Sequence, residues 1–233
     1  KGAISNSTID FGADNDTFTL SVAATSTTIL GGVGADTLVF STGANLVTSS
    51  VSGGTDGDSL VFSAVVKSAT SIAGGGGNDT MVFNSSVGGA FFTLDGGADS
   101  ISFVTKVSGA TMHGGNGSQT VAFSSAPDLI TFNGKFGGGS INGGSGNDSL
   151  VFSSDVNGTS ISGGAGADTI SGSISVGASG VSFWSGSGND TFDFGTGHIT
   201  GTANGTAYFW NEAGTDSIVL SNVTSATGAG VFF

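Results

Sequence analysis

The sequence predicts an all-β fold: a right-handed parallel β-roll or β-solenoid of about ten turns, with roughly 20–22 residues and two main strands in each turn. Three observations predict it. A glycine–aspartate phrase recurs at near-constant spacing, a short alternating apolar segment follows each copy, and a second apolar column precedes it. We therefore expect residues 1–233 to form one array, with an irregular loop at 124–140 and irregular terminal turns at 195–233.

The recurring phrase is clearest at residues 31–40, Gly-Gly-Val-Gly-Ala-Asp-Thr-Leu-Val-Phe. It returns nearly intact at 53–62, 74–83 and 143–152, and with changes at 11–20, 94–103, 114–123, 163–172, 185–194 and 211–220. Most copies follow one another at 20 to 22 residues, but the step from Gln119 to Asp148 is 29 residues. Such spacing indicates one strand–loop–strand unit per coil, and the glycine density excludes a helical repeat.

The strand after each loop alternates, so Leu38 and Phe40 should point inward while Thr37 and Val39 point outward. The inward positions form two columns: Phe18, Leu38, Leu60, Met81, Ile101, Val121, Leu150, Ile170, Phe192 and Ile218, then Phe40, Phe62, Phe83, Phe103, Phe123, Phe152 and Phe194. A second strand should precede each loop, with the inward column Ile29, Val51, Ile72, Phe92, Met112, Ile141, Ile161, Phe183 and Phe209. The 29-residue step contains the only proline, Pro127, and is interpreted as a loop extruded from one turn.

Composition limits the function. The chain carries four lysines, no arginine and 17 acids, 16 of them Asp, for a net charge of −13. This charge argues against nucleic-acid binding, which needs clustered Lys and Arg. No apolar stretch is long enough to suggest membrane insertion, and the absence of cysteine excludes disulfides and thiolate metal sites.

The loop chemistry favours calcium. Glycines permit positive φ and leave carbonyl oxygens unshielded, and calcium takes six to eight oxygen ligands. One carboxylate per coil, with carbonyls of its own and the next loop, could complete such a shell, giving about 7–9 ions in one row. The candidate metal ligands are Asp16, Asp36, Asp58, Asp79, Asp99, Asp148, Asp168, Asp190 and Asp216, with Gly32, Gly34, Gly54, Gly75, Gly77, Gly97, Gly144, Gly146, Gly164, Gly166, Gly186 and Gly188.

The phrase resembles the hemolysin-type (RTX) calcium-binding repeat, Gly-Gly-x-Gly-x-Asp-x-apolar-x, of bacterial proteins exported by type I secretion. The resemblance implies a secreted, extracellular or cell-surface protein and a parallel β-roll. The usual roll has calcium loops at both ends of each coil. Here the opposite bend, such as residues 41–45 or 153–157, lacks the motif, so we expect a single calcium-binding edge.

Some loops depart from the motif. Gln119 stands where the other copies have Asp and offers no charge, so its site should be weak or empty. The first loop has Phe11 and Asp14 at glycine positions, and the last has Asn211 and Glu212.

Three classes of function remain open. The first is an extracellular structural protein, a surface-layer or filament subunit that folds and assembles on binding calcium. The others are a secretion and folding module of a larger adhesin, toxin or exoenzyme, and a polysaccharide- or ice-binding solenoid. Catalysis is not expected, because neither His113 nor His198 has a partner placed by the repeat.

Two surfaces could carry the interactions of such a protein. A Ser/Thr–Val face, beginning at Thr37 and Val39, is expected to support self-association into a sheet or fibre. The aromatic side chains Trp184, Tyr208 and Trp210, expected on the same outward face as Phe91, could contact a cell-surface polysaccharide, another subunit or the end of the array.

Overall fold

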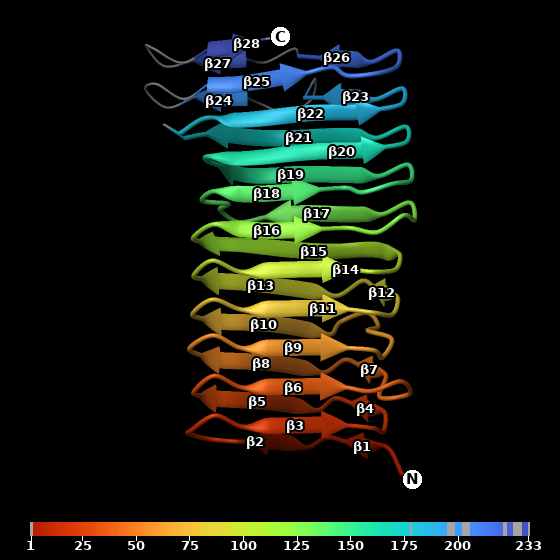
Figure 1. Ribbon diagram of the computed structural model, residues 1–233, viewed down its shortest axis with the longest axis vertical. Helices are drawn as coiled ribbons and strands as arrows, with labels where there is room; N and C mark the ends of the chain where they lie inside the picture. Colours follow the sequence, from red (N-terminus) through yellow and green to blue (C-terminus); the bar gives the residue numbers. More distant parts are fainter. Residues whose placement is uncertain are drawn as a thin grey trace.

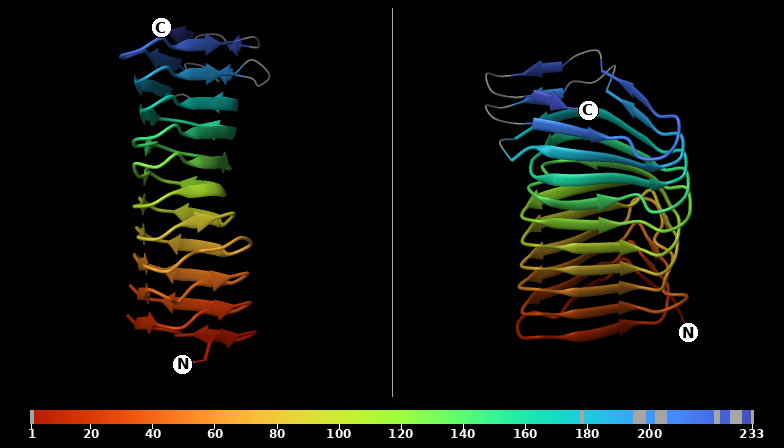
Figure 2. Two further views of the ribbon diagram at one scale, coloured as in Figure 1. Left: turned by 90° about the vertical axis from the view of Figure 1, so that its right-hand side faces the viewer. Right: turned by 45° about the horizontal axis from the view of Figure 1, so that its top comes forward.

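The computed structural model describes residues 2–177, 179–194, 199–201, 206–220, 223–225 and 230–232. Within them the chain is all-β, without a helix, and winds into a solenoid of stacked parallel strands (Figure 1). Figure 2 shows the coils one above another along the long axis. His198 and parts of the terminal turns expected at 195–233 lie outside the described residues.

Two long sheets and one short sheet make up the walls. Sheet A runs, in spatial order, β2 (Thr8–Asp10), β5 (Thr28–Val33), β8 (Ser50–Thr55), β10 (Ser71–Gly76), β13 (Phe91–Gly96), β15 (Val107–Asn116), β17 (Leu129–Asn133), β19 (Ser149–Val156), β21 (Thr169–Val176), β23 (Thr191–Asp193) and β26 (Ser217–Val219). Three further strands join it alongside: β12 (Val87–Gly88), β24 (Ile199–Gly201) and β27 (Val223–Ser225).

Sheet B runs β3 (Thr17–Leu20), β6 (Thr37–Phe40), β9 (Ser59–Phe62), β11 (Thr80–Phe83), β14 (Ser100–Phe103), β16 (Gln119–Ala122), β18 (Gly139–Asn142), β20 (Thr159–Ala165), β22 (Val181–Ser187), β25 (Thr206–Trp210) and β28 (Gly230–Phe232). The short sheet contains β1 (Ile4–Ser5), β4 (Ala24–Thr25) and β7 (Leu46–Val47).

The predicted alternation is present. In β6, Leu38 and Phe40 are fully buried while Thr37 and Val39 are only half-buried. Each strand pairs in parallel with the equivalent strand one coil later, so that Leu38 lies beside Leu60 and Phe40 beside Phe62 in register. Parallel pairing follows because a coil of about 20 residues returns the chain in the same direction.

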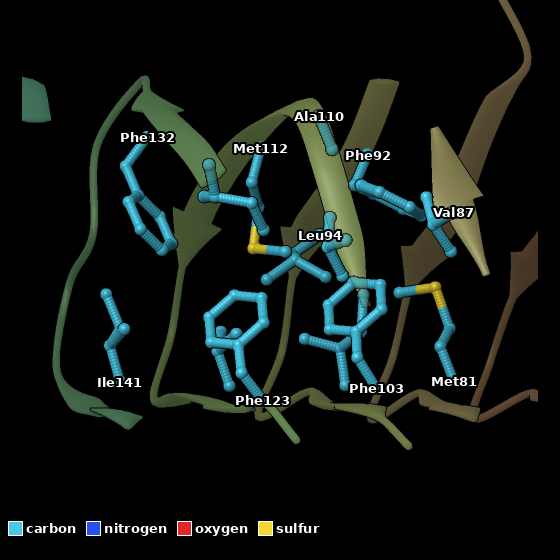
Figure 3. Close-up of a cluster of buried hydrophobic side chains, with 14 of the residues drawn as sticks. Met81, Val87, Phe92, Leu94, Phe103, Ala110, Met112, Phe123, Phe132 and Ile141 are labelled. Carbon is cyan, nitrogen blue, oxygen red and sulfur yellow. The ribbon is translucent and has the colours of Figure 1, made fainter. Parts of the chain in front are cut away.

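Aromatic stacking holds the coils together inside. Phe40, Phe62, Phe83, Phe103 and Phe123 stack along sheet B with ring centroids 4.5 to 5.2 Å apart. This phenylalanine column then ends, and the next stacked pair, Phe132 and Phe152 (4.7 Å), lies on sheet A. Figure 3 shows the change: Phe123 and Phe132 approach from opposite walls, and their rings are T-shaped at 6.5 Å.

The column moves because the repeat shifts by half a coil. Up to residue 122 the strand after each loop lies in sheet B, but from β17 onward it lies in sheet A. Accordingly, a strand that follows a loop pairs with a strand that precedes one: β16 pairs with β18, and Val121 lies beside Ile141. In Figure 1 the loops between β5 and β6 and their successors line the left edge, whereas those between β20 and β21 line the right edge.

The expected single edge of loops is therefore wrong. The repeated loops occupy two opposite edges, because the 29-residue step contains one full coil of 20 residues plus an extra nine-residue half-coil. The interpretation of 124–140 as an extruded loop is also wrong, since β17 pairs within sheet A and both Phe132 and Phe136 are buried.

The shift also divides the expected surfaces. The Ser/Thr–Val face is continuous on sheet B only through the first half, where Val39, Val61 and Val82 lie side by side. Tyr208 and Trp210 lie on sheet B, so they do not share a face with Phe91 of sheet A. Among the described residues, no helix is long and apolar enough to cross a membrane.

Candidate metal-binding loops

The loop glycines are required by backbone geometry. Gly54 has φ of +128°, and a Cβ on it would lie 2.0 Å from the carbonyl oxygen of Gly32 one coil earlier. A side chain is excluded there both by the left-handed backbone and by the close stacking of successive loops. All twelve glycines predicted as ligands have positive φ. The sequence therefore keeps their carbonyls close to the neighbouring coil.

The aspartates form hydrogen-bonded ladders along each edge. In the first row, one carboxylate oxygen (Oδ1) of Asp58 accepts the backbone N–H of Asp36, 2.7 Å away, and Asp79 does the same for Asp58 at 2.8 Å. The row runs from Asp16 through Asp36, Asp58, Asp79 and Asp99 to Gln119.

A second row on the opposite edge begins at Asp128 and continues through Asp148, Asp168 and Asp190 to Asp216. Asp128 was missed by sequence reasoning. Its loop, residues 123–128, contains no glycine. The alternating segment Asp128-Leu129-Ile130-Thr131-Phe132 nevertheless matches the corresponding segments of the other loops. The carbonyl of Ser124 takes the place of a loop glycine, accepting the N–H of Ser145 at 2.9 Å.

In nearly all of these aspartates the second carboxylate oxygen, Oδ2, has no hydrogen-bond partner. Oδ2 is buried without a hydrogen bond in nine aspartates: Asp16, Asp36, Asp58, Asp79, Asp99, Asp128, Asp148, Asp168 and Asp190. Most of these side chains are almost wholly enclosed, with Asp79 only 1% exposed. A buried carboxylate without a compensating group is costly, so each such oxygen is suited to bind a cation or a proton.

At five loops this oxygen lies so close to a glycine that a side chain could not be placed there. A Cβ placed on Gly53 would lie 2.3 Å from Asp58 Oδ2 and 2.6 Å from the carbonyl oxygen of Gly74. We call each such oxygen-lined space a glycine cradle. The five cradles lie at Gly31, Gly53, Gly74, Gly143 and Gly163, facing Asp36, Asp58, Asp79, Asp148 and Asp168.

Burial changes the acidity of these groups. Burial is the main reason that the pKa of Asp148 is raised to about 7; a backbone hydrogen bond from Asp128 opposes the rise, and the negative charges of Asp168 and Asp128 contribute to it. Burial likewise raises the pKa of Asp58, Asp79 and Asp168 to about 6. A bound cation would reverse this effect by stabilising the ionised form.

The donor set consists of oxygen atoms, which fits a hard cation. Within the described part of the chain, no three His, Cys, Asp or Glu side chains converge on one point. Each cradle instead offers one carboxylate oxygen, joined in four of the five by a backbone carbonyl oxygen of the next coil. Calcium accepts backbone carbonyls readily, whereas zinc prefers nitrogen or sulfur ligands.

Three loops depart from the motif, and the structure shows how each of them is built. Gln119 replaces the aspartate and remains in the ladder, accepting the N–H of Asp99 at 3.2 Å. In the first loop, Asp14 has φ of +80° and is exposed. In the last, Asn211 and Glu212 are exposed, and Asp216 is half-buried.

Comparison of the chain with models of known protein families, with curated proteins and with solved structures gave no match.

Proposed function

We propose that this chain is a calcium-dependent structural solenoid, a protein whose coils are joined by calcium ions along two edges. One observation carries the proposal: the loop carboxylates of successive coils each bury an oxygen that has no partner. The resemblance to the RTX repeat supports calcium in particular, and the oxygen-only surroundings agree with it.

Calcium binding would be coupled to folding. Without a cation, folding must bury a row of carboxylates, and neighbouring members such as Asp58 and Asp79 repel each other. A cation that binds only the folded loops removes this penalty and stabilises the fold by mass action. The resemblance supports an extracellular location, because a chain of this kind stays unfolded at cytosolic calcium levels and folds after export.

Circular dichroism during a calcium titration tests this function. We expect a weakly structured spectrum in excess chelator and a β-rich spectrum in calcium, with magnesium a poorer substitute because it demands strict octahedral geometry. A fully β-rich spectrum in chelator, unchanged by calcium, would contradict the proposal.

The structural role also requires self-association. The outward face of β6, β9 and β11 supports it, because Val39, Val61 and Val82 line up in register beside Thr37, Ser59 and Thr80. Electron microscopy in calcium should reveal ordered sheets or fibres. Val61→Lys should abolish them without changing the circular dichroism, whereas Val219→Lys, on the outward face of sheet A, should not. A persistent wild-type monomer in calcium would refute assembly.

A second candidate function, binding of a neutral polysaccharide, is favoured by the C-terminal part of sheet B. Tyr208 is 41% exposed, and Trp210, 48% exposed, stacks on Trp184 at 5.2 Å. A shallow depression of about 180 Å³ beside Tyr208 is lined by residues that include Thr159, Ser160, Ser179 and Ser182. Aromatic rings and hydroxyls suit sugar rings, and the acidic chain disfavours anionic ones.

Affinity electrophoresis in gels containing neutral polysaccharides would test this candidate. Tyr208→Ala should reduce retardation strongly. Phe91→Ala removes an equally exposed aromatic from sheet A and should have no effect. Equal retardation of all three proteins would exclude this site.

A further inference from the structure

The loops differ in the residue at their first position, five residues before the aspartate, which is Gly31 in the loop of Asp36. In five of them it is the glycine of a cradle. In the others it is a side chain or a glycine whose space is already filled. The aspartates of these two groups also have different neighbours, which indicates how many cations the molecule holds and where each row stops.

Gln119 ends the first row with a donor of its own. Its Oε1 accepts the N–H of Asp99, and its Nε2 donates to the carbonyl oxygen of Gly97 at 3.1 Å. Gln119 thus has a nitrogen that donates a hydrogen bond at the position where the aspartates have an Oδ2 without a partner. At Gly114 in the same loop, a Cβ would lie 2.4 Å from the carbonyl oxygen of Lys135 and 2.8 and 2.9 Å from two carbon atoms of the Phe136 ring, so the ring stands where the cradles have a carboxylate oxygen.

Ser185 ends the second row in a similar way. It stands at the first loop position, only 1% exposed, so its side chain occupies the space that a glycine leaves open. Its hydroxyl lies 3.2 Å from Asp216 Oδ2 and 3.3 Å from the Gly186 carbonyl, and it accepts the N–H of Glu212 at 3.0 Å. The single hydroxyl proton is best placed on the carboxylate, where the hydrogen bond is charge-assisted.

The remaining aspartates outside the cradles also have a side chain at the first loop position. Leu94 is fully buried in the loop of Asp99, and Phe123 and Phe11 hold this position in the loops of Asp128 and Asp16. In these loops, and in the Asp190 loop that Ser185 opens, Oδ2 is also buried without a hydrogen bond. They therefore differ from the five cradles in the side chain at the first position and not in the carboxylate.

The cradle aspartates lie beside a glycine and not beside a side chain. In all five cradles the buried Oδ2, which accepts no hydrogen bond, lies within 2.9 Å of the place where a Cβ would stand. Only in the cradles is the surrounding of this oxygen free of a side chain at the first loop position.

Building on the proposed calcium binding, we propose that the cations occupy only the five glycine cradles, three along the first edge and two along the second, and that Gln119 and Ser185 close the two rows as built-in substitutes for a cation. The ladder thus continues beyond the last ion of each row through protein hydrogen bonds alone.

Calcium counting on three variants tests this assignment. Bound calcium is measured by elemental analysis of desalted protein and by calorimetric titration, with circular dichroism in calcium to verify folding. Asp79→Asn should bind one ion fewer than wild type. Asp99→Asn, the same substitution one coil later, should bind the same number as wild type. Ser185→Gly opens a sixth cradle and should bind one ion more, whereas Ser187→Gly, an exposed position in the same loop, should not.

The outcomes separate the two proposals. Wild-type protein that binds no calcium would remove the proposed function and this assignment together. A wild type that binds calcium at more than five sites, loss of an ion in Asp99→Asn, or an unchanged count in folded Ser185→Gly would overturn the assignment alone.

Discussion

At the scale of single residues, the aspartate side chain has two separate tasks. Asp79 uses Oδ1 to hold the N–H of Asp58 on the previous coil, and this bond needs no cation. Its Oδ2 is buried without a hydrogen bond and is the oxygen that the proposed cation would bind. One residue type would therefore provide both the register between coils and the proposed metal site.

The elevated acidities predict how calcium-free protein responds to pH. The folded state keeps protons on Asp148 up to pH about 7, and on Asp58 and Asp168 up to about 6, whereas unfolded aspartates release theirs near pH 4. Between about pH 4 and 7 the folded state therefore binds more protons, so the free energy of unfolding must fall as pH rises.

Circular dichroism in chelator at several pH values measures this effect. The folded fraction should be larger at pH 5 than at pH 8, where the calcium-free protein is expected to be weakly structured. In saturating calcium the trend should reverse in the acidic range, because protons compete with the ion for the same oxygens. Asp148→Asn should flatten the calcium-free profile, and a calcium-free folded fraction that rises with pH would contradict this prediction.

At the scale of the loop, two adjacent glycines give a matched pair. Gly75 has φ of +112°, and a Cβ there would lie 1.9 Å from Gly54 O, whereas a Cβ on Gly76 would have nothing within 4 Å. Gly75→Ala should cost at least about 1–3 kcal/mol of unfolding free energy from backbone strain alone. Gly76→Ala should change it by less than about 1 kcal/mol. Denaturant unfolding in calcium compares them, and equal effects would show that the loops do not stack this closely.

The strands themselves could be predicted because alternation and burial are local properties. Leu38 and Phe40 point inward because one face of β6 is apolar. The alternation of the four residues of β6 is enough to predict this. The loop at 123–128 could not be recognised by its glycines, since Phe123, Ser124 and Ala126 stand at the three glycine positions. Its aspartate and the strand after it were the remaining signal.

At the scale of the whole molecule, the half-coil shift depends on nine residues. Deleting 120–128 joins Gln119 to Leu129 and restores a 20-residue step with the pattern Gln-Leu-Ile-Thr-Phe, which matches residues 99–103. We expect this variant to fold in calcium with all loops on one edge. Its circular dichroism should remain β-rich, because every later coil keeps its own internal contacts.

Cysteine pairs can show which arrangement forms, since the chain has no cysteine of its own. In the wild type Thr111 lies beside Thr131, so cysteines at these positions should crosslink. In the deletion variant Thr131 should move to sheet B and crosslink with position 102 instead. Crosslinking of 111 with 131 in the deletion variant would show that the shift does not depend on these nine residues.

The two-edge arrangement was hidden from sequence reasoning because columns of inward residues look the same in both sheets. Val121 and Ile141 serve different parts of the repeat yet pair in register, since both are apolar residues of similar size on alternating strands. Periodicity predicts which residues face inward. It does not say which wall they line, and only the 29-residue step contained that information.

The direction of the aspartate ladder also gives the array an order of assembly. The N–H of Asp36 is satisfied only by Asp58, and that of Asp148 only by Asp168, so each coil is completed by the one that follows it. A chain that emerges into calcium with its N-terminus leading always has one unfinished coil at the point of emergence. Each aspartate that emerges accepts the N–H of the preceding loop aspartate, while its own N–H waits for the next one. The stack therefore lengthens at one end only, like a polar filament.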